Sequence, residues 1–370
     1  MNSASYRLAA VGDVMLDRAV GEHFRRAPED YACRDCAGIL GTHDIVFANL
    51  ENPVGLRGMP HPRQHPNVTF RCHPSTLQVL RNLGITVVSL GNNHMLDYGG
   101  EALAETIQHL DANGIGHAGA GRNYREANEP LLLSINGNKV ALLSYVFLYS
   151  ASTARATPNR PGVSDHRMRN ILPRIRDLVR QQYRVIVSVH WGLEYSFFPI
   201  PYQMLQARRM IDNGASLILG HGPHYPQGIE SYRGGKIVYS LGNFIFDEPF
   251  KFANRSFIYG IGAAPYNRLF GEALYPVHIR EQVPVLVHGP QQRNIRRLVA
   301  RLGRLYASRG ERFWQDQNSA YFGDIVHRVL RTRSLKYAML PPPSFYSGVG
   351  LRNYARKLVP RALRHLVSPG

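Results

Sequence analysis

Short apolar runs alternate with amphipathic stretches along the first half of the chain. Arg7–Val11, Ile45–Ala48 and Thr86–Leu90 are short and apolar enough to be strands. Apolar residues at helical spacing predict helices over Pro74–Leu83 and Glu101–Asn113, the second of which is followed by a glycine stop. Strands that alternate with helices predict an α/β layered domain with a mixed sheet.

The same alternation continues to about residue 240. Asn136-Gly137 is a strong turn signal between two apolar runs, Leu131–Ile135 and Val140–Phe147, and therefore predicts a β-hairpin. Two further helices are predicted over Met168–Gln182 and Met204–Asn213. Three further strands are predicted over Val185–Val189, Ser216–Leu219 and Ile237–Ser240.

Polar residues of the kinds that bind metals follow these strands, at the place where open α/β sheets hold their ligands. They are Asp13; Asn49 and Glu51; Asn92, Asn93, His94 and Asp97; His190 and Glu194; His221 and His224; and Asn243. Each one alone is explained as a helix cap, a turn residue or a structural histidine. Together they supply the roughly seven or eight oxygen and nitrogen donors that a cluster of one or two divalent ions (Mn, Zn or Fe) requires.

The order of these motifs resembles the calcineurin-like metallophosphoesterase superfamily, and most closely the CapA family associated with poly-γ-glutamate capsule biosynthesis. The resemblance runs from Arg7 to Asp247 and is carried by GDVMLDR, NLENP, NNHMLDYG, HWGLEY, GHGPHYPQ and YSLGNFIFD. It implies a four-layer α/β/β/α sandwich, in which two mixed sheets lie face to face with helices outside. It also implies a metal-dependent hydrolase that cleaves a phosphoester or a γ-glutamyl amide bond in a small molecule or polymer precursor.

The resemblance also implies a role for each residue of the motifs. Six residues match metal ligands: Asp13, Glu51, Asn93, His190, His221 and His224. His94 matches the catalytic histidine that protonates the leaving group, and Asp97 and Glu194 would complete the catalytic set by orienting imidazoles. Asn49, Asn92 and Asn243 would support this shell.

Three motifs depart from the phosphoesterase pattern, one of them by an additional residue between His221 and His224. The first has Met15 where a histidine is usual, and the second has Asn49-Leu50-Glu51 in place of Gly-Asp. CapA-like proteins share these changes, which therefore support this branch of the superfamily. Because Met15 replaces a histidine, one metal site has lost a nitrogen donor. Two alternatives to a capsule-linked hydrolase stay open: a non-catalytic assembly component of a polymer-synthesis complex at the inner membrane, and a hydrolase of an unrelated small-molecule pathway.

The chain contains no run of about eighteen apolar residues, and Met1–Arg7 lacks a secretory signal pattern, which predicts a cytoplasmic protein. Three cysteines cannot form a disulfide scaffold. Cys33 and Cys36 form a C-x-x-C without the second pair of ligands of a zinc site, so we expect two ordinary loop thiols.

The net charge of +18 is concentrated at the carboxy-terminal end. Residues 291–370 contain sixteen Lys and Arg against three Asp and Glu. The composition changes near Pro290, so we predict a metallophosphoesterase-like domain over 1–290 and a basic, mainly helical extension over 291–370. A first helix would place Arg293, Arg296, Arg297, Arg301 and Arg304 opposite Leu298, Leu302 and Leu305.

A second amphipathic helix is predicted over Leu351–Val367. Two alternatives are open for it. It attaches the protein peripherally to an anionic membrane surface at the inner membrane face through 351–370, or it packs on the catalytic domain with its arginines in water. Nucleic acid ranks last as a partner, because no RNA- or DNA-binding motif occurs.

Overall fold

The computed structural model describes residues 5–26, 33–147, 150, 152–247, 252–264 and 268–308. Its larger sheet has eight strands: β1 (Tyr6–Val14), β2 (Ile45–Leu50), β3 (Val87–Ser89), β4 (Gly116–Ala118), β13 (Asn243–Ile245), β14 (Arg255–Ala264), β15 (Arg268–Arg280) and β16 (Val283–Leu286). They lie in the order β16-β15-β14-β1-β2-β3-β4, with β13 also paired to β1. The half from β1 to β4 is parallel, and β14 to β16 are antiparallel.

The smaller sheet has six strands: β6 (Leu131–Ile135), β7 (Asn138–Val146), β9 (Arg184–His190), β10 (Ala215–His221), β11 (Ile229–Tyr232) and β12 (Gly235–Val238). They lie in the order β11-β12-β10-β9-β7-β6, with a parallel centre and an antiparallel pair at each edge. The β6–β7 pair is the predicted hairpin, and Asn136 and Gly137 both have positive φ, as its tight turn requires.

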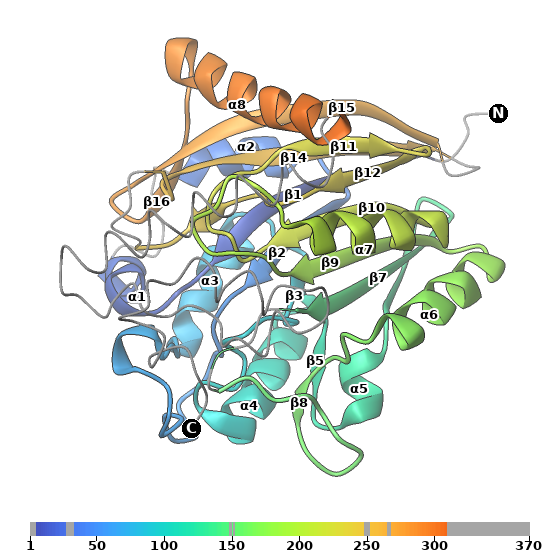
Figure 1. Cartoon of the computed structure of the whole chain (residues 1–370). Coiled ribbons are helices and arrows are strands. Elements are labelled where there is room, and N and C mark those ends of the chain that lie inside the picture. Colours follow the sequence, from blue (N-terminus) through green and yellow to red (C-terminus); the bar gives the residue numbers. More distant parts are fainter. Residues whose placement is uncertain are drawn as a thin grey trace, which may run out of the picture.

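Figure 1 shows the strands of the two sheets with helices around them. Three apolar layers hold the sheets and the helices together. The layer between the sheets includes Leu8, Phe47, Ile186, Leu219 and Tyr259. On the outer face of the larger sheet lie α1 (Arg18–Arg26), α2 (Arg34–Leu40), α3 (Gln78–Asn82) and α4 (Gly99–Ala112). On the outer face of the smaller sheet lie α6 (Met168–Arg180) and α7 (Pro201–Asp212). The four-layer α/β/β/α sandwich is therefore confirmed.

The cysteines differ from expectation. Cys33 caps the amino-terminal end of α2 and Cys36 lies within that helix, and both are buried, so they are not loop thiols. Burial, together with the neighbouring Cys33 and Asp35, raises the pKa of Cys36 to about 12. A thiol with such a pKa stays protonated at neutral pH, which fits a packing role within the apolar layer outside the larger sheet.

The first predicted basic helix is present as α8 (Gly289–Ser308), so the predicted boundary at 290/291 falls within it. Its arginines are exposed, whereas Ile295, Val299, Leu302 and Tyr306 are buried against the sandwich. The second predicted helix, Leu351–Val367, and the membrane-binding hypothesis for 351–370 lie outside the described residues. In the part that the structure does describe, no helix combines the length and the apolar character needed to cross a bilayer.

Helix α8 lies directly on the backbone that leads into β11. A Cβ atom on Gly303 would stand 2.4 Å from the carbonyl oxygen of Ile229, and one on Gly228 would stand 2.4 Å from the Gly303 nitrogen. We therefore expect Gly303→Ala to push α8 off the sheet and to lower the free energy of unfolding by about 1–3 kcal/mol. Chemical denaturation measures this change.

Gly38→Ala is the matched control, because Gly38 lies in α2 and no heavy atom would come within 4 Å of its Cβ. Removing a helical glycine there should leave stability unchanged or raise it slightly. Equal stability of the two variants would contradict the close contact between α8 and β11.

Candidate metal centre

Strand ends from both sheets meet at one point. Asp13 lies at the end of β1, in register with Asn49 on β2 and with Asn243 on β13. His190 and His221 are the last residues of β9 and β10, and they are paired across the smaller sheet. Register alone therefore makes these five polar residues neighbours within their sheets, and all of them are buried.

Glycines allow the backbones to approach closely around this point. A Cβ on Gly12 would stand 1.9 Å from the carbonyl oxygen of Gly242, so only glycine lets β1 lie this close to the chain that enters β13. Gly222 has a φ of 102°, and its N–H donates to Asp13 Oδ2 at 3.3 Å. His224 also has a left-handed backbone, with a φ of 58°, a conformation often found at functional sites.

Three imidazole rings converge on the carboxylate of Glu51, which follows β2. Its Oε1 lies 3.7 Å from Nε2 of His224, 3.9 Å from Nε2 of His190 and 4.0 Å from Nε2 of His94. Asp13, Glu51 and His224 each offer a ligand atom within 4.8 Å of the others. These distances are too long for hydrogen bonds between the three nitrogens and the carboxylate. Such a spacing is expected of groups that bind the same cation.

The carboxylate of Asp13 is the second acidic group of the cluster. It accepts hydrogen bonds from Asn49 Nδ2 at 2.9 Å and from His221 Nδ1 at 3.0 Å, and His224 Nδ1 lies 3.5 Å away. Burial raises the pKa of Asp13, but the hydrogen bonds from His221 and His224 outweigh burial and hold this pKa well below its usual range. Asp13 therefore stays a carboxylate at all ordinary pH values.

The nearby carboxylates also change the pKa of His224. Burial lowers the pKa of His224, but the carboxylates of Glu51, Asp13 and Glu194 outweigh burial and raise it well above its usual range. Burial lowers the pKa of His190 to about 3, so that this ring stays neutral with a lone pair available for a metal. The field at the centre of the cluster favours a positive charge, either a proton or a metal ion.

Orphaned polar atoms show that the residues present fit a divalent metal. Among the described residues, the buried atoms Asn93 Oδ1, His190 Nε2 and His221 Nε2 have no hydrogen-bond partner. A buried polar atom without a partner costs about 1–3 kcal/mol, so three of them in one cluster require an explanation. All three are oxygen or nitrogen atoms of the kinds that Mn, Zn and Fe accept, and the structure brings ligand atoms of Asp13, Glu51 and His224 within 4.8 Å of one another.

His94 differs from the other histidines because a carboxylate fixes its Nδ1. Asp97 Oδ2 lies 2.7 Å from this nitrogen, which leaves Nε2 directed at the cluster. Asp97 is itself held by the backbone N–H of Phe70 at 2.9 Å and by the hydroxyl of Ser152 at 2.5 Å. The Phe70 ring packs on the imidazole with the two ring centres 4.5 Å apart.

The three supporting asparagines orient ligands. Asn92 donates to Asn49 Oδ1 at 3.2 Å and accepts from the backbone N–H of His94 at 3.1 Å, so it ties two motifs together. Asn243 Oδ1 lies 2.8 Å from His224 Nδ1, which turns Nε2 of that ring toward Glu51. Glu194 is half-buried and reaches the cluster through its charge on His224.

Sequence reasoning missed a group of hydroxyl residues that hold Asn93. Ser150, Ser152 and Thr153 donate to the carbonyl oxygen of Asn93 at 2.8, 3.4 and 3.0 Å. The only sequence feature that could have indicated these residues is the occurrence of three hydroxyl side chains within four positions. No pattern near them in the sequence connects them to the Asn93 motif, which lies almost sixty residues earlier. They fix the backbone of the residue that precedes His94 and whose buried side-chain oxygen has no hydrogen-bond partner among the described residues.

Comparison with known proteins agrees with this set of motifs. Residues 7–248 match the model of a family described as bacterial capsule synthesis protein PGA_cap. The capsule biosynthesis protein CapA of Bacillus anthracis is 34% identical over 246 residues, which are 65% of this chain and 60% of that protein. The PGA biosynthesis protein CapA of Bacillus subtilis is 31% identical over 239 residues, 64% of this chain and 62% of that protein. The chain thus spans less than two thirds of the length of these relatives.

Among solved structures, the NAD nucleotidase of Haemophilus influenzae aligns with 88% of this chain and 60% of its own. The TM-score is 0.42 and the sequence identity is 10%. A TM-score this low supports no structural argument, so the fold is assigned from the strand order and packing of this chain alone.

Proposed function

The chain belongs to the bacterial capsule synthesis protein family PGA_cap, and from this premise we propose that it is a metal-dependent hydrolase acting on a capsule polymer or its precursor. The family match over 7–248 confirms the resemblance of the motifs between Arg7 and Asp247 to the CapA family. Because the chain spans only part of the relatives it matches, the activity and the substrate both belong to the proposal.

One observation carries the metal dependence: the buried carboxylates of Asp13 and Glu51 lie close to His224, and three further buried donor atoms, on Asn93, His190 and His221, have no partner among the described residues. A second one supports catalysis beyond metal storage. His94 stands at the edge of the same cluster, and Asp97 holds it in one orientation. A structural metal needs no such histidine, because structural sites close their shell with ligands alone.

The proposed ligands are Asp13, Glu51, Asn93, His190, His221 and His224. A divalent ion supplies Lewis-acid polarisation of a substrate oxygen and a nucleophile at neutral pH. The protein's own residues supply the proton that the leaving group requires. Water adds across a P–O or C–N bond, and the leaving oxygen or nitrogen takes a proton from Nε2 of His94. Asp97 keeps the Nδ1–H of His94 in place and stabilises the charged ring before the transfer.

The names of the relatives guide the choice of substrate. The two CapA proteins act in capsule and PGA biosynthesis by name, so we propose a phosphoester or a γ-glutamyl amide in that metabolism as the bond cleaved. The buried shell mixes carboxylate, amide and imidazole donors, a set that suits either a phosphoryl or a carbonyl oxygen.

Metal removal tests the proposal. We expect purified protein to contain about one or two equivalents of Mn, Zn or Fe by elemental analysis. Turnover should disappear after treatment with a chelator and return when one of these ions is added. The assay panel is phosphomonoesters, phosphodiesters and γ-glutamyl amides. A fully metal-loaded protein that cleaves none of them would contradict the enzyme and favour the non-catalytic assembly component.

A further inference from the structure

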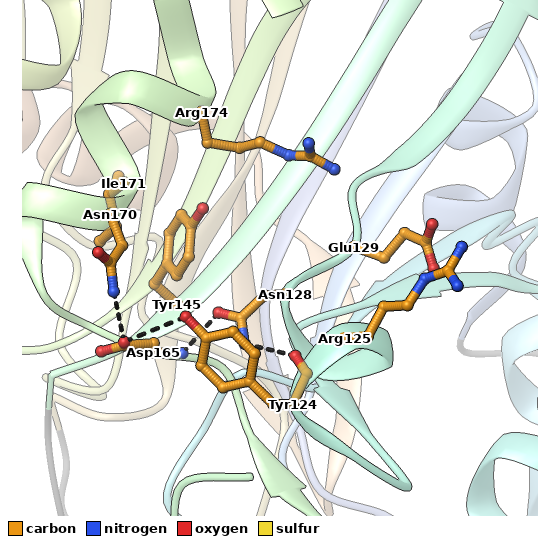
Figure 2. Close-up of a pocket in the computed structure, with 9 residues that line it drawn as sticks. All are labelled: Tyr124, Arg125, Asn128, Glu129, Tyr145, Asp165, Asn170, Ile171 and Arg174. Atoms are coloured by element: carbon orange, nitrogen blue, oxygen red, sulfur yellow. Dashed lines mark hydrogen bonds between the residues drawn. The ribbon is translucent and has the colours of Figure 1, made fainter. Parts of the chain in front are cut away.

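Apart from the metal centre, a cavity of about 470 Å³ opens on the smaller sheet between α5 (Tyr124–Asn128), the end of β7 and the start of α6 (Figure 2). Its size lies within the range of small-molecule sites. Tyr145 on β7 packs in the outer apolar layer of this sheet, as does Val189 on β9. His190 follows Val189 and therefore faces the other side of the sheet, so this cavity is separate from the metal centre.

Tyr145 is the first indication of a ligand. Its side chain is only 3% exposed, and no hydrogen bond of its hydroxyl occurs within the described part of the chain. The hydroxyl is not one of the fully enclosed atoms that lack a partner, so its small exposed area faces the cavity that Tyr145 lines. Figure 2 shows the hydroxyl pointing toward the Arg174 side of the cavity. Burial raises the pKa of Tyr145, although Arg174 lowers it in part. The hydroxyl therefore keeps its proton and offers a donor to the cavity.

Arg174 on α6 and Arg125 on α5 also line the cavity. In the described part of the chain, neither guanidinium makes a hydrogen bond or an ion pair, and both residues are exposed. Guanidinium groups bind carboxylates and phosphates with two parallel hydrogen bonds. The uncommitted groups around the cavity are thus a hydroxyl donor and two fixed positive charges.

Of the other polar groups of the wall, Asp165 and Asn128 have partners already, and Glu129 is exposed to solvent. Asp165 accepts from Asn170 Nδ2 at 2.7 Å and forms an ion pair with Arg167, which neutralises its charge. Asn128 accepts from the backbone N–H of Asp165 at 2.8 Å and donates to the carbonyl oxygen of Tyr124 at 2.7 Å. Glu129 is exposed, so water and salt screen its charge.

We propose that this cavity binds a small molecule through a carboxylate or phosphate group, which the Tyr145 hydroxyl and the Arg174 guanidinium hold and Arg125 attracts. An oxyanion would accept a hydrogen bond from the hydroxyl and pair with the exposed guanidinium at once. The proposal goes beyond the hydrolase, and it needs neither the metal nor the activity of the first site.

Isothermal titration of the full-length, metal-loaded protein at low salt tests it, with inorganic phosphate and glutarate as separate probes. We expect saturable binding of at least one of the two anions. Arg174→Gln and Tyr145→Phe should each weaken it by roughly tenfold, the usual loss for a hydrogen bond to a charged group. Arg169→Gln is the matched control, because it makes the same charge change at an exposed residue of α6 outside the lining.

The outcomes separate this site from the metal centre. Binding of phosphate alone identifies a phosphoryl compound as the ligand class, and binding of glutarate alone identifies a carboxylate. Equal affinity in the wild type and all three variants would assign the anion to the metal centre and overturn the proposal, as would no binding of either probe at millimolar concentration. Metal content and turnover of Arg174→Gln should match the wild type, so failure here leaves the proposed hydrolase standing.

Discussion

Replacing Glu51 with glutamine is expected to weaken metal binding by more than about 100-fold, beyond the 10- to 100-fold loss seen when a residue behind a ligand is changed. Glu51 is only 1% exposed, and its Oε1 lies within 4.0 Å of the Nε2 atoms of His94, His190 and His224. Glutamine keeps the shape of the side chain but removes the charge that balances the ion. Elemental analysis after dialysis, and titration against a chelator of known affinity, measure the loss.

Glu101→Gln makes the same chemical change on the surface of α4, where Glu101 is exposed, and should leave metal content unchanged. The fold of Glu51→Gln should persist, because the three apolar layers do not include this residue. Circular dichroism checks this. Wild-type metal affinity in Glu51→Gln would show that the carboxylate of Glu51 is not a ligand of the metal.

The strands that build the centre were predictable from sequence because central parallel strands are buried on both faces. Ile45–Ala48, Val185–Val189 and Ser216–Leu219 are apolar except for Ser188 and Ser216, and each lies inside an observed strand. Polar residues directly after such runs, such as His190 and His221, stand out against this background. The register that pairs them across the sheet depends on contacts between distant segments, so the sequence predicts the set of residues but not the distances.

The strands β14 and β15 were not predicted. β14 is apolar on both faces and contains Gly260 and Gly262, while β15 contains Gly271 and Pro276, so neither shows the alternation of a half-buried strand. They are held as strands by pairing with β1 and with each other. Tertiary pairing of this kind overrides local propensity and leaves no local signal.

The contacts around His94 could likewise be predicted from the sequence only in part. Asp97 follows His94 by three residues, so the pair was visible in the sequence. Phe70 and Ser152, which hold Asp97 in place, lie 27 and 55 residues away. Their contribution is geometric, and only the fold brings them to the site.

Replacing His94 with alanine is expected to lower turnover by about 10²- to 10⁴-fold, the usual range for loss of a general acid, and to leave metal content near the wild-type level. Asp97 holds Nδ1 of His94 at 2.7 Å, while Nε2 is directed at Glu51 from 4.0 Å. This nitrogen is not among the enclosed atoms without a partner, which include Asn93 Oδ1, His190 Nε2, His221 Nε2 and Asn243 Nδ2. The six other residues therefore suffice as ligands.

The pH dependence distinguishes a proton donor from a residue that only maintains structure. A general acid acts only in its protonated form, so general acid catalysis predicts that wild-type turnover falls with rising pH. His94→Ala should lose this alkaline decline along with most of its rate, whereas a merely loosened site would keep the decline at a lower rate. His288→Ala is the control, since His288 is an exposed histidine before α8. Wild-type turnover in His94→Ala would show that another group protonates the leaving atom, and a large loss of metal would make His94 a ligand.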